Sequence, residues 1–175
     1  MSDRNVVLTG FMGTGKTTVG RALADRLERE FVDTDRLIEE RYGPIPTIFA
    51  EHGEDAFRRY ERDVASELAD RRRLVIATGG RMMIDAANAQ RLGATGDVMC
   101  LVASLDTILD RVDVDGAGAT RPLLRGDDVR TRVADLLAER TEAYGAFLQV
   151  DTDGRTPDEV AVAIAEQLGV ERADG

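Results

Sequence analysis

The residues from Gly10 to Thr17 have the types and spacing needed to bind a phosphate group. They read GFMGTGKT and fit the pattern G-x-x-x-x-G-K-[ST]. Glycines allow the backbone to curl so that its N–H groups point at an anion. Lys16 can reach the β- and γ-phosphates of a nucleotide, and the Thr17 hydroxyl can ligate Mg²⁺. We therefore expect a nucleotide-binding loop between an apolar run at residues 5–9 and the helical pattern that follows it.

Lys16 differs from every other basic residue of the chain. Of the 23 basic residues, 22 are arginine and Lys16 is the single lysine, so this position is expected to need an ammonium group. A guanine-reading Asn-Lys-x-Asp motif requires a second lysine and is excluded. The apolar runs at residues 74–77 and 98–102 do not end in the Asp or Asp-Glu of a motor-type ATPase. Of the protein classes that have such a nucleotide-binding loop, the small-metabolite kinases remain.

Asp33 and Asp35 follow the apolar run at residues 31–33 with a spacing of two. In extended backbone this spacing places two side chains on the same side. Asp33 would then help to hold a metal, and Asp35 would orient or deprotonate an acceptor hydroxyl. The alternative is helix capping by Asp35, which would leave Asp33 without a role.

Arginines on two helical patterns are candidates for binding an anionic acceptor. Arg58 and Arg59 are neighbours, so on a helix they point ~100° apart and only one can face a pocket. Glu61 follows Arg58 by three residues and can brace its guanidinium. Arg140 lies late on a second helical pattern.

These residues need a scaffold, and short apolar runs alternate with helical patterns along the chain. The predicted strands are residues 5–9, 31–33, 74–77, 98–102 and 148–150, and the predicted helices include 17–30, 55–70, 105–112 and 129–144. Such alternation predicts an α/β fold with a parallel sheet covered by helices on both faces. Ligands of such sheets bind beyond the carboxyl ends of the strands. Residues 113–120 are small, polar and glycine-rich, which predicts a mobile loop or a plain connector.

Composition narrows the class of partners. The chain has 175 residues, enough for one domain, and a net charge of −10 with a pI near 4.7, which argues against nucleic acid. No run is long and apolar enough to span a membrane, and the first residues lack a signal-peptide pattern, so we expect a cytoplasmic protein. His52 is expected to mark a helix end, and Cys100 to be a buried small hydrophobe.

Taken together, the motifs resemble the shikimate kinase family over residues 10 to 157. The matching elements are the phosphate-binding loop, Asp33-Thr34-Asp35, Phe57-Arg58-Arg59 with Glu61, Thr78-Gly79-Gly80, Arg121-Pro122-Leu123-Leu124, Arg140 with Tyr144, and Asp151-Thr152. The resemblance implies a three-layer α/β/α P-loop kinase fold with a five-stranded parallel sheet of order 2-3-1-4-5. It also implies a monomer with a single domain over residues 1–175, an acceptor-binding region at about 33–62 and a lid at about 113–125.

The resemblance further implies a reaction and a set of site residues. ATP would transfer its γ-phosphoryl group to the 3-hydroxyl of shikimate, in aromatic amino-acid biosynthesis. The catalytic residues would be Lys16, Asp35 and Arg121. ATP would contact Gly13, Thr14, Gly15, Lys16, Thr17, Thr18, Arg111, Arg121 and Arg155, with Mg²⁺ near Thr17 and Asp33. Shikimate would contact Asp35, Arg58, Gly79, Gly80 and Arg140.

One position departs from the family pattern, which has three consecutive glycines where this chain has Gly79-Gly80-Arg81. Arg81 either points away from the pocket, or reaches in and changes the acceptor, or blocks the acceptor site. A kinase for another small polyhydroxy carboxylate and a non-catalytic nucleotide-binding protein are therefore the alternative functions. The non-catalytic alternative conflicts with the sequence, which contains every residue that phosphoryl transfer would need.

Overall fold

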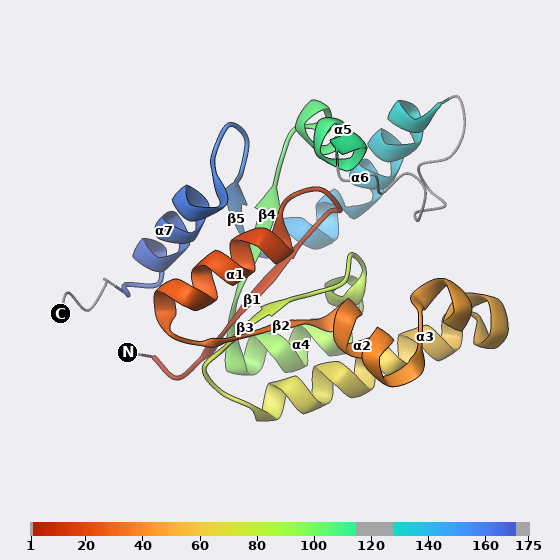
Figure 1. Cartoon of the computed structure of the whole chain (residues 1–175), viewed down its shortest axis with the longest axis horizontal. Helices are drawn as coiled ribbons and strands as arrows, with labels where there is room; N and C mark the ends of the chain where they lie inside the picture. Colours follow the sequence, from red (N-terminus) through yellow and green to blue (C-terminus); the bar gives the residue numbers. More distant parts are fainter. Residues whose placement is uncertain (1, 115–127, 171–175) are drawn as a thin grey trace.

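Five parallel strands form the centre of the molecule. The structure, a computed structural model, describes residues 2–114 and 128–170. The strands are β1 (Asn5–Gly10), β2 (Glu30–Asp33), β3 (Leu74–Ala77), β4 (Gly96–Val102) and β5 (Leu148–Asp151). Their order in the sheet is β2-β3-β1-β4-β5, which confirms the order expected from the family resemblance. β1, which carries the phosphate-binding loop, is thus the central strand (Figure 1).

Helices cover both faces of this sheet. One face is packed by α1 (Lys16–Leu27) and α7 (Pro157–Gln167). The other is packed by α2 (Thr34–Tyr42), α3 (Ile45–Asp70) and α4 (Ala86–Thr95), and by the short 3-10 helix η1 (Met82–Ile84). α6 (Val129–Gly145) lies against β4 on this second face, and α5 (Leu105–Val114) packs against α6. The expected three-layer α/β/α arrangement is confirmed (Figure 1).

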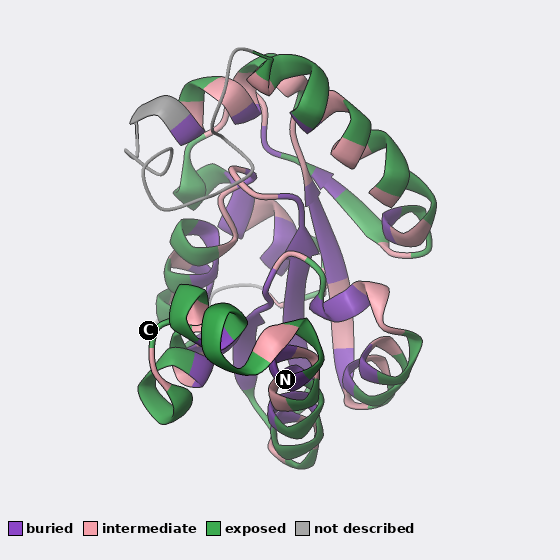
Figure 2. Ribbon diagram, turned by 90° about the vertical axis from the view of Figure 1, so that its right-hand side faces the viewer, coloured by how far each residue is buried: buried purple, intermediate pink, exposed green. Residues whose placement is uncertain are grey.

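Alternating side chains of the strands supply the two halves of the core. Val6 and Leu8 of β1 contribute to the core beneath α1 and α7, whereas Val7 contributes to the core beneath α3 and α4. This follows from the two-residue period of a strand. Because both faces are covered, all six residues of β1 are buried. Figure 2 shows the central strands as the buried part of the molecule and the outward helix faces as exposed.

The strands are in register at their carboxyl ends. Ala77 of β3 pairs with Asp33 of β2 on one side and with Leu8 of β1 on the other. Gly10 at the end of β1 pairs with Leu101 of β4. The loops after β1, β2 and β3 therefore leave the sheet at the same edge, where ligands of open parallel sheets bind.

Some predicted boundaries were wrong. The helix predicted to reach residue 30 ends at Leu27, because Glu28 adopts a left-handed conformation (φ 51°) and Glu30 already belongs to β2. The helix predicted from residue 55 starts at Ile45 and is interrupted at Gly53 (φ 79°, ψ 172°), next to His52. α5 continues to Val114, beyond the predicted end at residue 112, and the rest of the predicted lid lies outside the described residues.

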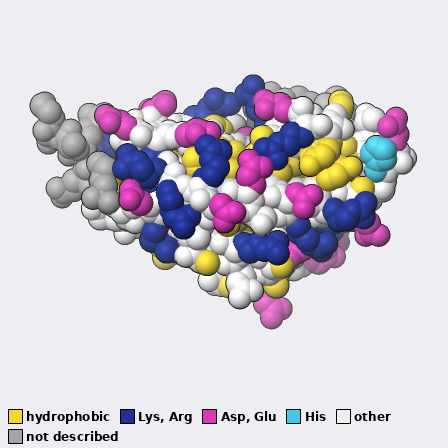
Figure 3. All heavy atoms as spheres, turned by 90° about the horizontal axis from the view of Figure 1, so that it is seen from below, with side chains coloured by type: hydrophobic (Ala, Val, Ile, Leu, Met, Phe, Trp, Pro, Cys, Tyr) yellow, Lys and Arg dark blue, Asp and Glu magenta, His cyan; other side chains and the backbone are white. Residues whose placement is uncertain are grey.

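The surface carries charges of both signs. On the face shown in Figure 3, basic and acidic side chains are interspersed. Pairs such as Arg41–Glu67 (2.7 Å) and Arg62–Asp85 (2.9 Å) link neighbouring elements. Within residues 2–114 and 128–170, no helix combines the length and apolar content needed to cross a membrane.

A stability prediction concerns Asn5, which is fully buried at the start of β1. Its amide donates to the carbonyls of Leu68 and Arg71 and accepts from the Leu74 N–H, so it joins β1 to the end of α3 and the start of β3. We expect Asn5→Ala to lower the free energy of unfolding by about 2–3 kcal/mol, because buried backbone groups lose their partners.

The measurement is urea unfolding followed by circular dichroism. Glu40→Ala, which removes the exposed pair with Arg36, is the matched control and should change the free energy by less than about 0.5 kcal/mol. Equal effects of the two substitutions would contradict the role given to Asn5.

Candidate active site

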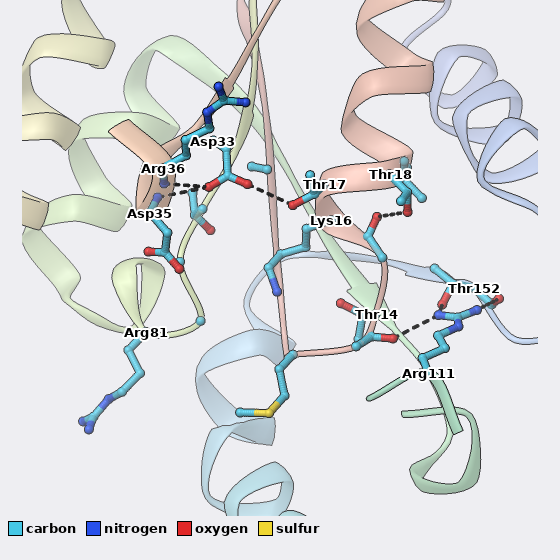
Figure 4. A pocket seen from close by; sticks show the side chains of 18 of the residues that line it. Thr14, Lys16, Thr17, Thr18, Asp33, Asp35, Arg36, Arg81, Arg111 and Thr152 are labelled. Atoms are coloured by element: carbon cyan, nitrogen blue, oxygen red, sulfur yellow. Dashed lines mark hydrogen bonds between the residues drawn. The ribbon is translucent and has the colours of Figure 1, made fainter. Parts of the chain in front are cut away.

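A cavity of about 960 Å³ opens at the carboxyl edge of the sheet. Its lining comes from the loop after β1 and the start of α1, the end of β2, helices α2 and α3, the loop after β3, helices α5 and α6, and the turn from β5 into α7. Of the residues expected at the site, the cavity brings together Gly13, Thr14, Gly15, Lys16, Thr17, Thr18, Asp33, Asp35, Arg58, Gly79, Gly80, Arg111, Arg140 and Arg155. Arg121 lies outside the described residues. Figure 4 shows part of this lining from close by.

The loop between β1 and α1 presents backbone donors to the cavity. Gly15, the residue before α1, has a φ of 93° and offers no side chain to cap the helix. The first N–H groups of α1 therefore face the cavity without a side-chain cap, the arrangement that binds phosphate at helix N-termini. The Lys16 ammonium donates to the carbonyls of Gly10 (2.8 Å) and Phe11 (2.9 Å), which holds it over the same loop.

Thr17 and Asp33 provide oxygen atoms that fit a divalent cation. The Thr17 hydroxyl donates to Asp33 Oδ2 over 2.9 Å, so a hydroxyl and a carboxylate from two elements meet at one point (Figure 4). Mg²⁺ prefers oxygen ligands and usually takes only one or two from a protein, the others being water and phosphate. The donor set therefore fits Mg²⁺ beside a bound nucleotide.

Asp33 and Asp35 do not share an extended strand, so the prediction that such a strand sets them on the same side was wrong. Asp33 is itself the N-cap of α2, accepting from the N–H groups of Asp35 (3.1 Å) and Arg36 (3.2 Å). Asp35 lies in the first turn of the helix, so it does not cap it and is not in a strand. Both carboxylates still line the cavity, because the helix begins at the sheet edge.

Asp35 lies directly against the loop after β3. A Cβ atom added to Gly79 would lie 2.3 Å from Asp35 Oδ1, so any larger residue here would displace the Asp35 carboxylate. The Gly79 N–H donates to the buried Thr34 hydroxyl (2.9 Å), which ties the loop to α2. The acceptor hydroxyl expected at Asp35 would thus meet a surface of glycine backbone.

Arg58 is held by two carboxylates of unequal burial. Its Nη1 donates to Glu61 Oε2 over 2.6 Å, and its Nη2 donates to Glu54 Oε1 over 3.0 Å. Burial by itself lowers the pKa of Arg58, but the hydrogen bonds and charges of Glu61 and Glu54 raise it above its usual value. Burial raises the pKa of Glu61, with a further contribution from Asp35, against the opposing effect of Arg58. Arg59 points to solvent, as expected for the neighbour of Arg58.

α6 holds the next glycine of the same loop. The Tyr144 hydroxyl donates to the Gly80 carbonyl over 2.5 Å, and Arg140 Nη1 donates to it over 3.4 Å. The Arg140 guanidinium also lies 5.0 Å from the centre of the Phe11 ring. Arg140 is thereby placed between the phosphate-binding loop and the loop after β3.

The two remaining arginines expected to contact ATP lie at the other end of the cavity. Arg111 donates to the Gly13 carbonyl (3.2 Å) and to Thr152 (3.0 Å), which links the phosphate-binding loop to the turn after β5 (Figure 4). Arg155 donates to the carbonyls of Asp151 and Glu159.

Arg81 lines the cavity, which stays open beside it. Its side chain is 53% exposed, and its Nη1 lies 3.6 Å from Glu54 Oε1. Figure 4 shows it leading away from Lys16 and the phosphate-binding loop. Its φ of −120° is ordinary for any residue, so glycine is not required here.

Three interactions at the site were not predicted from the sequence. Glu54 could have been found, since it precedes Arg58 by four residues on a helix. The hydrogen bonds from Gly79 to Thr34 and from Tyr144 to Gly80 span 45 and 64 residues, and no local spacing indicates them.

Comparison with known proteins gives one consistent answer. The sequence model of the shikimate kinase family matches residues 12–169. A shikimate kinase from Nitrosospira multiformis is 41% identical over 98% of this chain and 88% of its own length. One from Symbiobacterium thermophilum is 44% identical over 94% of this chain and 95% of its own length.

A solved structure extends the match to three dimensions. The shikimate kinase of Acinetobacter baumannii in complex with shikimate superimposes with a TM-score of 0.87 at 36% identity, covering 98% of this chain and 96% of that one. The family model, the sequence relatives and this structure agree, and the chain belongs to the shikimate kinase family.

Proposed function

We propose that the protein transfers the γ-phosphoryl group of ATP to the 3-hydroxyl of shikimate. Family membership implies ATP use. The observation that carries the acceptor is the second half of the cavity, where Asp35 lies beside a glycine loop flanked by Arg58 and Arg140. A carboxylate to orient a hydroxyl and guanidinium groups to bind a carboxylate match a hydroxylated acid such as shikimate.

The chain's own groups divide the work of phosphoryl transfer. Lys16 and the N–H groups at the start of α1 bind the β- and γ-phosphates and neutralise charge on the transferring group. Asp35 orients the acceptor hydroxyl or takes its proton. Arg58 and Arg140, with the Gly79-Gly80 backbone, hold the acceptor at its carboxylate. Arg111 and Arg155 flank the adenine, and Arg121, which lies outside the described residues, meets the transferring phosphate.

Thr17 and Asp33 would hold Mg²⁺, Asp33 through water, and the bound cation would supply positive charge beside the phosphates of ATP. Their hydrogen bond supports this role, because it places both oxygens at the phosphate side of the cavity.

We propose the following organisation of the molecule. Residues 1–175 form one catalytic domain, with the acceptor-binding region at about 33–62 and the lid at about 113–125. The enzyme acts as a monomer in the cytoplasm on small molecules. The net charge of −10 supports the exclusion of nucleic acid as a partner.

A coupled assay of ADP release tests the function directly. With Mg-ATP and a panel of shikimate, quinate and gluconate, we expect saturable ADP release with shikimate well above the rate without acceptor. Lys16→Ala should lower kcat by about 100-fold or more. Saturable release with another acid alone would assign the enzyme to that acceptor, and no release with any acceptor would favour a non-catalytic nucleotide-binding protein.

A second prediction concerns the metal. We expect Asp33→Asn to raise the Mg²⁺ concentration for half-maximal rate by about tenfold, because a carboxylate that orients the metal's ligands is lost. Asn caps helices as well as Asp does, so α2 should remain intact and thermal unfolding should be unchanged. An unaltered Mg²⁺ dependence would remove Asp33 from the metal site.

A third prediction concerns Arg121. Arg121→Ala should lower kcat by about 100-fold or more, because a positive charge on the transferring phosphate is lost, while ATP still binds. Arg130→Ala, which removes the exposed pair with Asp106, is the control and should leave kcat unchanged. Wild-type turnover in Arg121→Ala would exclude Arg121 from the mechanism.

A further inference from the structure

Glu54 links Arg58 to Arg81. One oxygen, Glu54 Oε1, accepts from Arg58 Nη2 (3.0 Å) and Nε (3.3 Å) and lies 3.6 Å from Arg81 Nη1. Arg58 and Glu54 lie one helical turn apart on α3, whereas Arg81 comes from the loop after β3. Two guanidinium groups from different elements therefore share one carboxylate at the rim of the cavity.

Glu54 occupies one of the edges at which Arg58 can pair with a carboxylated acceptor. A carboxylate pairs bidentately with two adjacent N–H groups of a guanidinium, and Glu54 takes the edge formed by Nε and Nη2. Glu61 takes Nη1. Two carboxylates thus face one guanidinium, and a third carboxylate can pair with Nε and Nη2 only if Glu54 withdraws.

Burial decides which carboxylate can withdraw. The side chain of Glu61 is 2% exposed, so loss of its pairing would leave a buried charge. The side chain of Glu54 is 54% exposed, and exposed ion pairs are weak and readily exchanged. The Arg58 hydrogen bond lowers the pKa of Glu54, which keeps this carboxylate ionised near neutral pH.

Arg81 offers Glu54 a second cation. Its guanidinium is already near the shared oxygen, and its side chain is 53% exposed, so little desolvation opposes a closer pairing. We propose that Glu54 is a displaceable counterion of Arg58, and that Arg81 is the positioning residue to which Glu54 transfers when a carboxylated acceptor binds. This inference rests on the proposed function, since it concerns the acceptor side of the same site.

A double-mutant cycle tests the exchange in the coupled assay with shikimate. Arg81→Gln should raise the KM for shikimate by about five- to tenfold, because Glu54 then stays on Arg58. kcat should change by less than about twofold and the KM for ATP should not change, since Arg81 lies away from the transferring phosphate. Arg81→Lys keeps the charge and should restore most of the affinity.

A second pair of variants distinguishes the exchange of Glu54 between two arginines from a direct attraction between Arg81 and the acceptor. Glu54→Gln should lower the KM for shikimate, and in that background Arg81→Gln should change it by less than about twofold. If Arg81 instead contacted the acceptor itself, Arg81→Gln would raise KM equally in both backgrounds. That result, or an unchanged KM in the single variant, would overturn the proposal.

Two controls complete the experiment. Arg62→Gln removes an arginine from the same helix, one turn after Arg58, whose partner is Asp85 and which does not line the cavity. Its KM for shikimate should equal the wild-type value. Turnover of the wild-type enzyme separates a failure of the proposed function from a failure of the exchange. If the wild-type enzyme shows no turnover with shikimate, the proposed function is contradicted. If it turns over shikimate but Arg81→Gln has equal effects in both backgrounds, only the exchange is contradicted.

Discussion

The turn from β1 into α1 constrains the rest of the molecule. It must curl within a few residues so that backbone N–H groups and the Lys16 ammonium point into one cavity. Gly10 shows how tight the turn is, because a Cβ there would lie 2.3 Å from the Leu101 carbonyl of β4. β1 is flanked by β3 and β4, and the order β2-β3-β1-β4-β5 places it at the centre. The carboxyl ends of its neighbours then deliver the acceptor residues to the same edge.

Basic side chains line the cavity although the chain as a whole is acidic. The net charge is −10, yet the cavity is the proposed site of a nucleotide and an anionic acceptor. The arginines that line it are held in place by carboxylates or carbonyl oxygens: Arg58 by Glu61 and Glu54, and Arg140 by Gly80. A guanidinium fixed in this way loses little conformational entropy when it binds a ligand. In the proposed exchange the carboxylates that position Arg58 also compete with the ligand, so their burial decides which of them withdraws.

Much of the architecture could be predicted from the sequence. The strands were recognised from short apolar runs, and β3 has the predicted bounds. The phosphate-binding loop was recognised from a fixed spacing of glycines and Lys16, since the chemistry of that loop is local. The order of the strands was not visible in any local pattern and came from the family resemblance. The misplacement of Asp35 came from assuming extended backbone, when Asp33 had already started a helix.

The sequence by itself determined the nucleotide half of the proposed site, because eight consecutive residues from Gly10 to Thr17 contain its main donors. It also determined the bracing of Arg58 by Glu61, because three residues on a helix bring the two side chains together. Only the tertiary structure decided the acceptor half. Gly79 lies against Asp35, Tyr144 holds Gly80, and Arg81 reaches the rim near Glu54, through contacts between segments far apart in the chain. Such contacts depend on how the sheet aligns its loops, and residue spacing along the chain carries no information about them.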